Sequence, residues 1–262
     1  MRVSYQGEPG AFSEDAARLL VAGCEPVACA TFDDTFAAAA SGRTDAALLP
    51  VENSISGAVP RVYDLLWNDP ALTVHDEIVY RVVQNLIALP GAALEALEEV
   101  RSHPVALEQC RNFLTAHPRL RATAVADTAG AVREIVRLGD RALGAIASAA
   151  AAETYGATIL QPGIQDVAAN FTRFFLLRPG RAAASRAGRA CIALVLEHKP
   201  GALRRALGAF AERNVNLRSI VSRPSLDEPF TYRFYLEIEG APEQLAAALG
   251  IVTGTIRVLG AY

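Results

Sequence analysis

Short apolar runs alternate with amphipathic segments over the first two thirds of the chain, and this alternation constrains the fold most. Residues 46–53 ("AALLPVEN") read as a strand and residues 32–42 ("FDDTFAAAASG") as a helix, and the same alternation recurs to about residue 178. Such a pattern is typical of an α/β fold with mostly parallel sheets. The β-branched segment 72–89 predicts two strands that cross between two lobes, with a ligand cleft between those lobes.

A different pattern begins near residue 190. Residues 179–189 are small, polar and basic without any period, which predicts a linker. Residues 190–262 then read as strand, helix, strand, strand, helix and strand, the ferredoxin-like βαββαβ order. Within them, residues 230–239 alternate apolar and polar side chains, so we expect an antiparallel strand with one buried and one solvated face.

Composition removes several classes of function. A chain of 262 residues is long enough for one large or two ordinary domains, and its net charge of -3 gives no basic field for nucleic acid. No apolar run reaches the length of a membrane span, and the N-terminus lacks a secretory apolar region. The four cysteines are scattered and form no CxxC, which predicts reduced, buried thiols in a cytoplasmic protein without a structural metal.

Polar side chains follow two predicted strands at their carboxyl ends, which is the ligand side of an α/β sheet. Glu52 and Asn53 follow a strand, Ser102 and His103 follow another, and Pro104 after them fits the first turn of a helix. Two simpler interpretations stay open. The first cluster is equally typical of a polar turn in which Ser54 caps the next helix, and a lone histidine is more often structural than catalytic.

The stretch "NFTRFFLL" (residues 170–177) places a charge inside an apolar strand. Arg173 either reaches water along its stem or has an anionic partner, because an unpaired buried charge is costly. An arginine at a strand end can bind a carboxylate through two parallel hydrogen bonds, while Thr172 can donate a hydrogen bond and Phe174 can pack on a flat ring. We therefore expect a small anionic ligand.

Taken in order, "LLPVENSISGAV", "SHPVALEQC" and "NFTRFFLL" resemble the prephenate dehydratase family, and "GALRRALGAFAERNVNLRSIVSRPS" resembles the ACT regulatory domain. The resemblance covers essentially the whole chain. It implies a two-lobed catalytic domain over residues 1–178, similar to a periplasmic-binding-protein fold, then a linker over 179–189 and a ferredoxin-like ACT domain over 190–262. It also implies conversion of prephenate to phenylpyruvate, water and CO2 in phenylalanine biosynthesis, without a metal or organic cofactor.

The resemblance assigns a catalytic site, which would consist of Glu52, Asn53, Ser102, Gln109, Thr172, Arg173 and Phe174. It also implies a homodimer or homotetramer that binds phenylalanine as a feedback effector at a subunit interface. That effector site would consist of Gly201, Ala202, Leu203, Asn216, Leu217, Ser222, Arg223 and Pro224. Three positions depart from the family pattern: Val105 replaces a glutamine, Arg204 a valine and Val221 a glutamate. The last two predict weakened or altered control by phenylalanine, with catalysis retained.

Other functions remain open at this point. Arogenate dehydratase performs the same reaction on the transaminated substrate, and the sequence does not separate the two. A non-catalytic sensor would combine a two-lobed binding protein with an amino-acid-sensing domain, but the intact Thr-Arg-Phe motif argues against it. A DNA-binding regulator is weaker still, because neither a helix-turn-helix nor a basic patch is evident.

Overall fold

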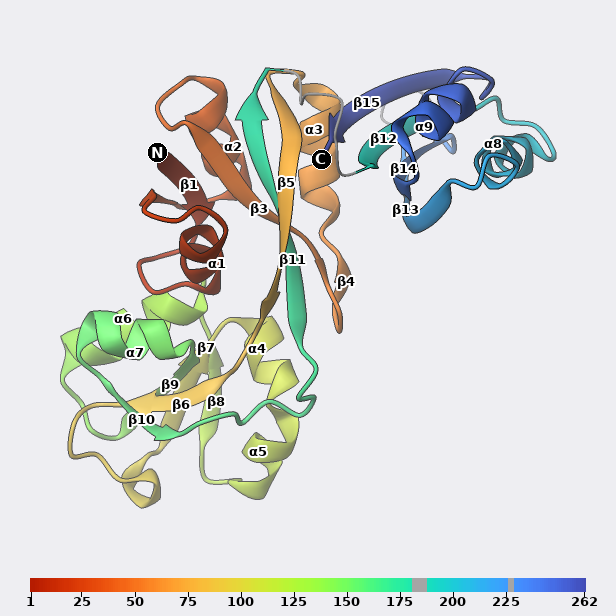
Figure 1. Cartoon of the computed structure of the whole chain (residues 1–262). Helices are drawn as coiled ribbons and strands as arrows, with labels where there is room; N and C mark the ends of the chain where they lie inside the picture. The colour runs from red at the N-terminus through yellow and green to blue at the C-terminus, as the bar shows by residue number, and fades with distance from the viewer. Residues whose placement is uncertain (181–187, 226–228) are drawn as a thin grey trace. The chain divides into compact units, whose positions relative to one another are not determined.

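The computed structural model describes residues 1–180, 188–225 and 229–262. Its contacts divide the chain into two compact units (Figure 1). The first unit contains Met1–Gly57 and Ile78–Phe174, and the second contains Ala58–Glu77 and Phe175–Tyr262. The domain boundaries expected from the sequence stay a prediction, and residues 181–187 of the expected linker lie outside the described part of the chain.

The first lobe of unit 1 is a parallel sheet. Strand β1 (Arg2–Gln6) lies between β2 (Glu25–Cys29) and β3 (Ala46–Asn53), connected by helices α1 (Phe12–Leu20) and α2 (Phe32–Ala40). The short strand β4 (Gly57–Ala58) pairs with β3. The run from Ala46 to Leu49 is fully buried, so β3 is anchored in the core up to the point where its polar end emerges.

The second lobe of unit 1 is a mixed sheet with the order β10-β6-β9-β7-β8. Its strands are β6 (Asn85–Ala88), β7 (Glu99–Ser102), β8 (Arg121–Ala124), β9 (Leu143–Ala147) and β10 (Thr158–Gln161). Strand β7 runs parallel to β8 and β9, whereas β6 is antiparallel to β9 and β10. Helices cover both faces, as a buried α/β sheet requires. They are α4 (Pro104–Gln109), α5 (Arg111–Ala116), α6 (Thr128–Leu138) and α7 (Ala149–Tyr155), with a 3-10 turn, η1, at Leu94–Ala96.

The sequence predicts one helix over residues 104–117, and this prediction is wrong. The structure has two short helices, α4 and α5, separated at Cys110, whose φ of -117° and ψ of 27° are not helical. The Gln109 carbonyl accepts a hydrogen bond from the Asp166 N–H at 2.7 Å. The break lets Gln109 and Cys110 both be buried, although adjacent residues of one continuous helix point to different sides.

A glycine joins the two lobes of unit 1. The Ser148 hydroxyl at the start of α7 donates to the Gly10 carbonyl at 2.5 Å. Gly10 has a φ of +84°, and a Cβ there would lie 2.6 Å from the Ala151 Cα. Only glycine fits such a contact. Gly10 thus meets the backbone of α7.

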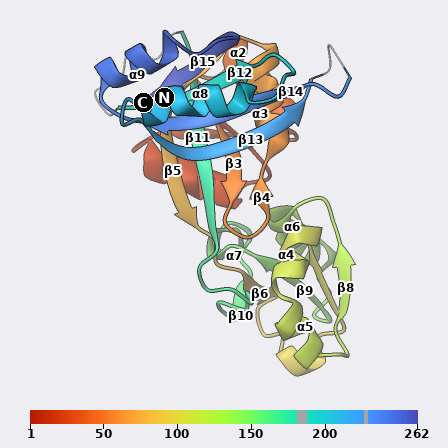
Figure 2. The same ribbon diagram turned by 90° about the vertical axis from the view of Figure 1, so that its right-hand side faces the viewer.

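Unit 2 contains the predicted βαββαβ fold, which the structure confirms (Figure 2). Its elements are β12 (Arg189–Val195), α8 (Ala202–Ala211), β13 (Asn216–Pro224), β14 (Tyr232–Glu239), α9 (Pro242–Leu249) and β15 (Thr255–Ala261). The antiparallel sheet has the order β13-β14-β12-β15, and α8 and α9 share a core with it. Helix α3 (Pro60–Asn68) also belongs to unit 2, while strands β5 (Leu72–Arg81) and β11 (Phe171–Pro179) each contribute residues to both units.

Strand β14 was expected to have one solvated face, and this expectation is wrong. Arg233, Tyr235 and Glu237 on that face are all buried. Helix α3 covers them: the rings of Tyr63 and Tyr235 lie 5.1 Å apart, and the Arg233 guanidinium lies 4.5 Å from the centre of the Trp67 ring. The alternation of apolar and polar side chains along the strand identifies its polar face, but it does not show that α3, which is distant in sequence, covers that face.

The structure bears on membrane spans, metal sites and cysteine pairing. Among the described residues, no helix is long and apolar enough to cross a membrane. Within the same residues, no three His, Cys, Asp or Glu side chains gather closely enough to hold a metal ion. All four cysteines are free and buried, as predicted from their spacing.

Candidate active site

Asn53, the last residue of β3, is the centre of a cluster of hydrogen bonds in unit 1. Its Nδ2 donates to the Asn170 Oδ1 at 2.8 Å and to the Thr172 Oγ at 3.0 Å. Its Oδ1 accepts the backbone N–H groups of Ile55 and Ser56 at 3.0 and 2.9 Å. Both ends of this amide are therefore used, and its donor side faces the segment that precedes the Thr-Arg-Phe motif.

Ser54 fixes the same segment through the backbone. Its N–H donates to the Phe171 carbonyl at 2.8 Å, and its hydroxyl accepts from the Phe171 N–H at 2.9 Å. The expectation that Ser54 caps the next helix is wrong, because α3 begins at Pro60 after the residue Val59 and has no side-chain cap. Its hydroxyl instead aligns the start of β11 with the end of β3.

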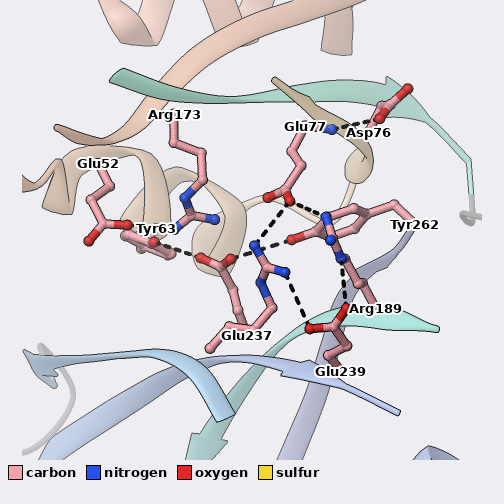
Figure 3. A network of polar contacts seen from close by, with 10 residues as sticks. Glu52, Tyr63, Asp76, Glu77, Arg173, Arg189, Glu237, Glu239 and Tyr262 are labelled. Carbon is pink, nitrogen blue, oxygen red and sulfur yellow. Dashed lines mark hydrogen bonds and ion pairs between the residues drawn. The ribbon is translucent and has the colours of Figure 1, made fainter. Parts of the chain in front are cut away.

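Arg173 has an anionic partner within the protein, which answers the question that its sequence context raised. Its Nη2 donates to the Glu52 Oε2 at 2.8 Å, and Figure 3 shows the two side chains next to each other. The Arg173 side chain is 11% exposed and that of Glu52 is 44% exposed. This contact places Glu52 where it orients the guanidinium.

Gln109 and Ser102 are placed differently from each other. The Gln109 Oε1 accepts from the Asn170 Nδ2 at 2.9 Å and from the Gln84 Nε2 at 3.4 Å, so it is linked to the Asn53 cluster. Ser102 is fully buried, and its hydroxyl donates to the Ile146 carbonyl of β9 at 2.6 Å. In this structure the Ser102 hydroxyl therefore joins two strands of the second lobe.

Phe174 and His103 both have structural contacts. Phe174 is buried in the middle of β11. His103 precedes α4, and its Nδ1 accepts the Val105 N–H at 3.2 Å. Burial lowers the pKa of His103, although the nearby Asp127 opposes this shift. The neutral imidazole that results is the form able to accept the capping hydrogen bond.

Two residues of the cluster were missed in the sequence. Asn170 and Gln84 are both buried; Asn170 connects Gln109 to Asn53 and Gln84 donates to Gln109, yet neither residue was expected in the site. A signal for each existed. Asn170 stands directly before a strand with polar residues on both sides of Phe171, and Gln84 interrupts an apolar run between two predicted strands. Buried amides of this kind are found where hydrogen-bond partners await them.

The expected effector residues lie on β13 and at the start of α8 in unit 2. Gly201 precedes α8 with a φ of +81°, followed by the partly buried Ala202 and Leu203. Along β13 the side chains alternate: Asn216, Ser222 and Pro224 are exposed, whereas Leu217 and Arg223 are partly buried. Arg223 donates twice to Asp64 of α3, at 3.2 and 2.7 Å.

A second group of charges in unit 2 consists of Glu77, Arg189, Arg218 and Glu239, which we call the charged network. Arg189 contacts Glu77 at 2.5 Å and Glu239 at 3.4 Å, as Figure 3 shows. Arg218 contacts the same two carboxylates at 3.6 and 3.3 Å. The hydrogen bond from Arg218 lowers the pKa of Glu239. Pairs of opposite charge thus join β5, β12, β13 and β14.

Comparison with known proteins agrees with this architecture. The family model described as prephenate dehydratase matches residues 3–182, and that of the ACT domain matches residues 192–252. Arogenate dehydratase 2 of Petunia hybrida is 39% identical over the whole chain and 71% of its own length. Two solved structures superpose closely. A prephenate dehydratase from Arthrobacter aurescens in complex with L-Phe has a TM-score of 0.89 at 29% identity, covering 99% of this chain and 89% of its own. A protein described as a novel type of quorum-quenching acylase has a TM-score of 0.90 at 34% identity, covering 99% and 97%.

These matches and the α/β fold define a carbon–oxygen lyase of the dehydratase class, linked to aromatic amino-acid biosynthesis. The chain belongs to the prephenate dehydratase family and has a C-terminal ACT domain.

Proposed function

We propose that the protein converts prephenate to phenylpyruvate, water and CO2, and that phenylalanine inhibits it through the ACT domain. The observation that supports the reaction most directly is the hydrogen bond from the Asn53 Nδ2 to the Thr172 Oγ at 3.0 Å. A hydroxyl that accepts from a neighbour keeps its own hydrogen for another acceptor. Thr172 is thereby oriented as a donor.

The chemistry needs such a donor. As the ring carboxylate of prephenate leaves as CO2, its bonding electrons move through the ring and the C4–O bond breaks. The oxygen that departs takes both electrons of that bond and then a proton to become water. A threonine hydroxyl is too weak an acid to transfer its proton efficiently. Thr172 instead stabilises the charge that develops on the leaving oxygen with a preorganised hydrogen bond.

Arg173 supplies positive charge for a substrate that carries two carboxylates. Its planar guanidinium matches a carboxylate better than an ammonium does. Glu52 acts through Arg173, since the 2.8 Å contact fixes the orientation of the guanidinium. We therefore favour a positioning role for Glu52 over a role as general acid. Aromatisation of the ring supplies the driving force, so this reaction scheme uses no metal or organic cofactor.

Feedback by phenylalanine is the second part of the proposal. The ACT match over residues 192–252 and the likeness to a dehydratase in complex with L-Phe support it. Phenylalanine would bind near Gly201 and the residues Ser222 to Pro224, at an interface in a homodimer or homotetramer. Light scattering with and without phenylalanine tests the assembly, and a monomer in both conditions would contradict an effector site between subunits.

The decisive experiment is turnover of prephenate and of arogenate at neutral pH, with and without phenylalanine. Neutral pH matters because acid promotes the uncatalysed reaction. Phenylpyruvate from prephenate, with lower turnover when phenylalanine is present, is the expected result. Turnover without any response to phenylalanine would contradict the regulatory part alone.

Two other functions are favoured by particular observations. The 39% identity to an arogenate dehydratase favours arogenate as substrate, and turnover of arogenate alone would establish this. The 34% identity to a quorum-quenching acylase is higher than the 29% identity to the dehydratase in complex with L-Phe. Release of a free acid from acylated signal molecules, with neither dehydratase substrate consumed, would establish acylase activity.

A further inference from the structure

Four side-chain amides form a continuous chain of hydrogen bonds that ends at Thr172. We call Gln84, Gln109, Asn170 and Asn53 the amide relay. The Gln84 Nε2 and the Asn170 Nδ2 both donate to the Gln109 Oε1, at 3.4 and 2.9 Å. The Asn170 Oδ1 accepts from Asn53 at 2.8 Å. Asn170 is 0% exposed, so solvent cannot replace either of its partners.

The contacts give each amide one orientation. The Asn53 Oδ1 receives two backbone N–H groups, so its Nδ2 must face Asn170 and Thr172. Asn170 consequently presents its oxygen to Asn53 and its nitrogen to Gln109. If the oxygen and nitrogen of Asn170 were exchanged, its nitrogen would face the Asn53 nitrogen and its oxygen would face the Gln109 oxygen, so neither hydrogen bond could form. Fixed polarity along a buried chain of amides makes each bond depend on its neighbours.

We propose that Asn170 is a positioning residue for the dehydration: its Oδ1 completes the hold on the Asn53 amide that the backbone N–H groups of Ile55 and Ser56 begin, and Asn53 in turn directs the Thr172 hydroxyl hydrogen toward the leaving oxygen. The inference rests on the proposed function for its catalytic consequence. Within the described residues, the one side-chain hydrogen bond of Thr172 is the bond that its hydroxyl accepts from Asn53. The Asn53 Nδ2, which Asn170 helps to hold, therefore determines that the Thr172 hydroxyl acts as a donor to the substrate.

Asn170 needs both a donor and an acceptor on one rigid group, without charge. The charged side chains on the segments that hydrogen-bond to Asn170 or to its partner Gln109 are Glu52, Arg81, Glu108, Arg111, Asp166 and Arg173. Three are acidic and three are basic, so their effects on a new charge at residue 170 oppose one another. Burial then decides, and it disfavours an ionised carboxylate at this position.

Asn170→Asp tests the relay. A protonated aspartic acid reproduces the amide pattern, because its O–H donates to Gln109 and its carbonyl oxygen accepts from Asn53. The ionised form still accepts from Asn53 but has no hydrogen to donate, so repulsion from the Gln109 Oε1 should displace the carboxylate and, with it, the Asn53 amide. Burial raises the pKa of this new carboxyl. Activity should therefore be present below that pKa and be lost as pH rises through it.

The measurement is kcat and KM from about pH 5.5 to about pH 9, a range that a raised carboxyl pKa enters. Rates are expressed per folded molecule and corrected for the uncatalysed reaction. At high pH, kcat should fall on the order of 10², the effect of a lost preorganised donor, and it should recover on acidification. Asn170→Ala should lose kcat at every pH, with KM within about threefold of wild type, because it breaks the relay permanently.

Asn85→Asp is the matched control. Asn85 is also buried, at 3% exposed, and its Nδ2 donates to the Ala147 carbonyl at 3.1 Å without touching Asn53 or Thr172. It should lower stability but leave the pH profile of kcat unchanged. A wild-type profile in Asn170→Asp, or a loss that acid does not reverse, would overturn the proposal.

A structural readout separates this inference from the proposed function. If wild type turned over neither prephenate nor arogenate, the proposed function would be wrong, and the relay would still be tested by a crystal structure of Asn170→Ala. The Asn53 amide should then leave its contact with Thr172. Unchanged positions of Asn53 and Thr172 would contradict the relay whatever the enzyme does.

Discussion

Two polar clusters of the molecule, one in each unit, are built in opposite ways. In unit 1, the amide relay joins Gln84, Gln109, Asn170 and Asn53 through neutral groups only. In unit 2, the charged network and the Arg223–Asp64 pair join strands and a helix through ions. Neutral amides fix where each hydrogen points without adding a field, whereas ion pairs hold elements together with energies that depend on salt and protonation. A proposed reaction site needs hydrogen bonds of fixed direction, whereas a regulatory fold needs ion pairs that hold its strands and helix together.

The largest expected effect breaks the end of the relay. Thr172→Ala removes the proposed donor, so kcat should fall on the order of 10²–10³ with little change in stability. Thr172→Ser keeps a hydroxyl beside Asn53 and should retain much of the activity. Steady-state kinetics on prephenate measures both, and a near wild-type rate for Thr172→Ala would refute the donor role.

The next effect tests the charge in unit 1. Arg173→Lys replaces a planar guanidinium by a point charge, so kcat/KM should fall by about tenfold to a hundredfold, the range for charged hydrogen bonds. Glu52→Gln keeps an oxygen beside Arg173 and should cost less, with an unchanged pH–rate profile.

Arg81→Lys is the matched control, because Arg81 is exposed and makes a 3.4 Å contact with the Ala168 carbonyl. It should leave kcat and KM within about twofold of wild type, as expected for a surface arginine. If Arg173→Lys behaved like Arg81→Lys, a carboxylate-binding role for Arg173 would be wrong.

Sequence patterns predict some features of the two regions and miss others. They predicted the strand that ends at Asn53 and the pairing need of Arg173, because hydrophobic runs and a charge inside one are local signals. They missed Asn170 and Gln84, since an amide has no pattern that names its partner. They also misjudged β14, where Arg233 and Glu237 look solvated until Tyr63 and Trp67 of α3 are brought onto them.

A smaller effect is expected where charge links α3 to the expected effector strand. Asp64→Asn removes the negative charge that faces Arg223 and weakens the two hydrogen bonds between these partly buried side chains. The free energy of unfolding should fall by about 1–2 kcal/mol, between the values for surface and buried pairs. Inhibition by phenylalanine should weaken several-fold, while kcat without phenylalanine stays unchanged.

Glu212→Gln controls for the loss of a carboxylate in unit 2. Glu212 is exposed and lies 3.7 Å from Arg213, so its replacement should change stability by less than about 0.5 kcal/mol. Thermal unfolding and phenylalanine titration compare the two variants. Equal inhibition in Asp64→Asn and wild type would show that this ion pair does not connect effector binding to α3.

The smallest effect concerns His103, a partly buried histidine of unit 1. Burial lowers the pKa of His103 below its ordinary value, so the folded state prefers the neutral ring that accepts the Val105 N–H. A lowered pKa means that this contribution to stability is complete above about pH 6.5 and is lost as pH falls through the folded-state pKa. His103→Asn keeps an acceptor at the helix start but does not titrate, so unfolding should lose up to about 1 kcal/mol of its pH dependence between neutral and mildly acidic conditions. His198→Asn, on an exposed loop of unit 2, should retain the wild-type pH dependence. If both variants kept it, the cap at His103 would not be the titrating contact.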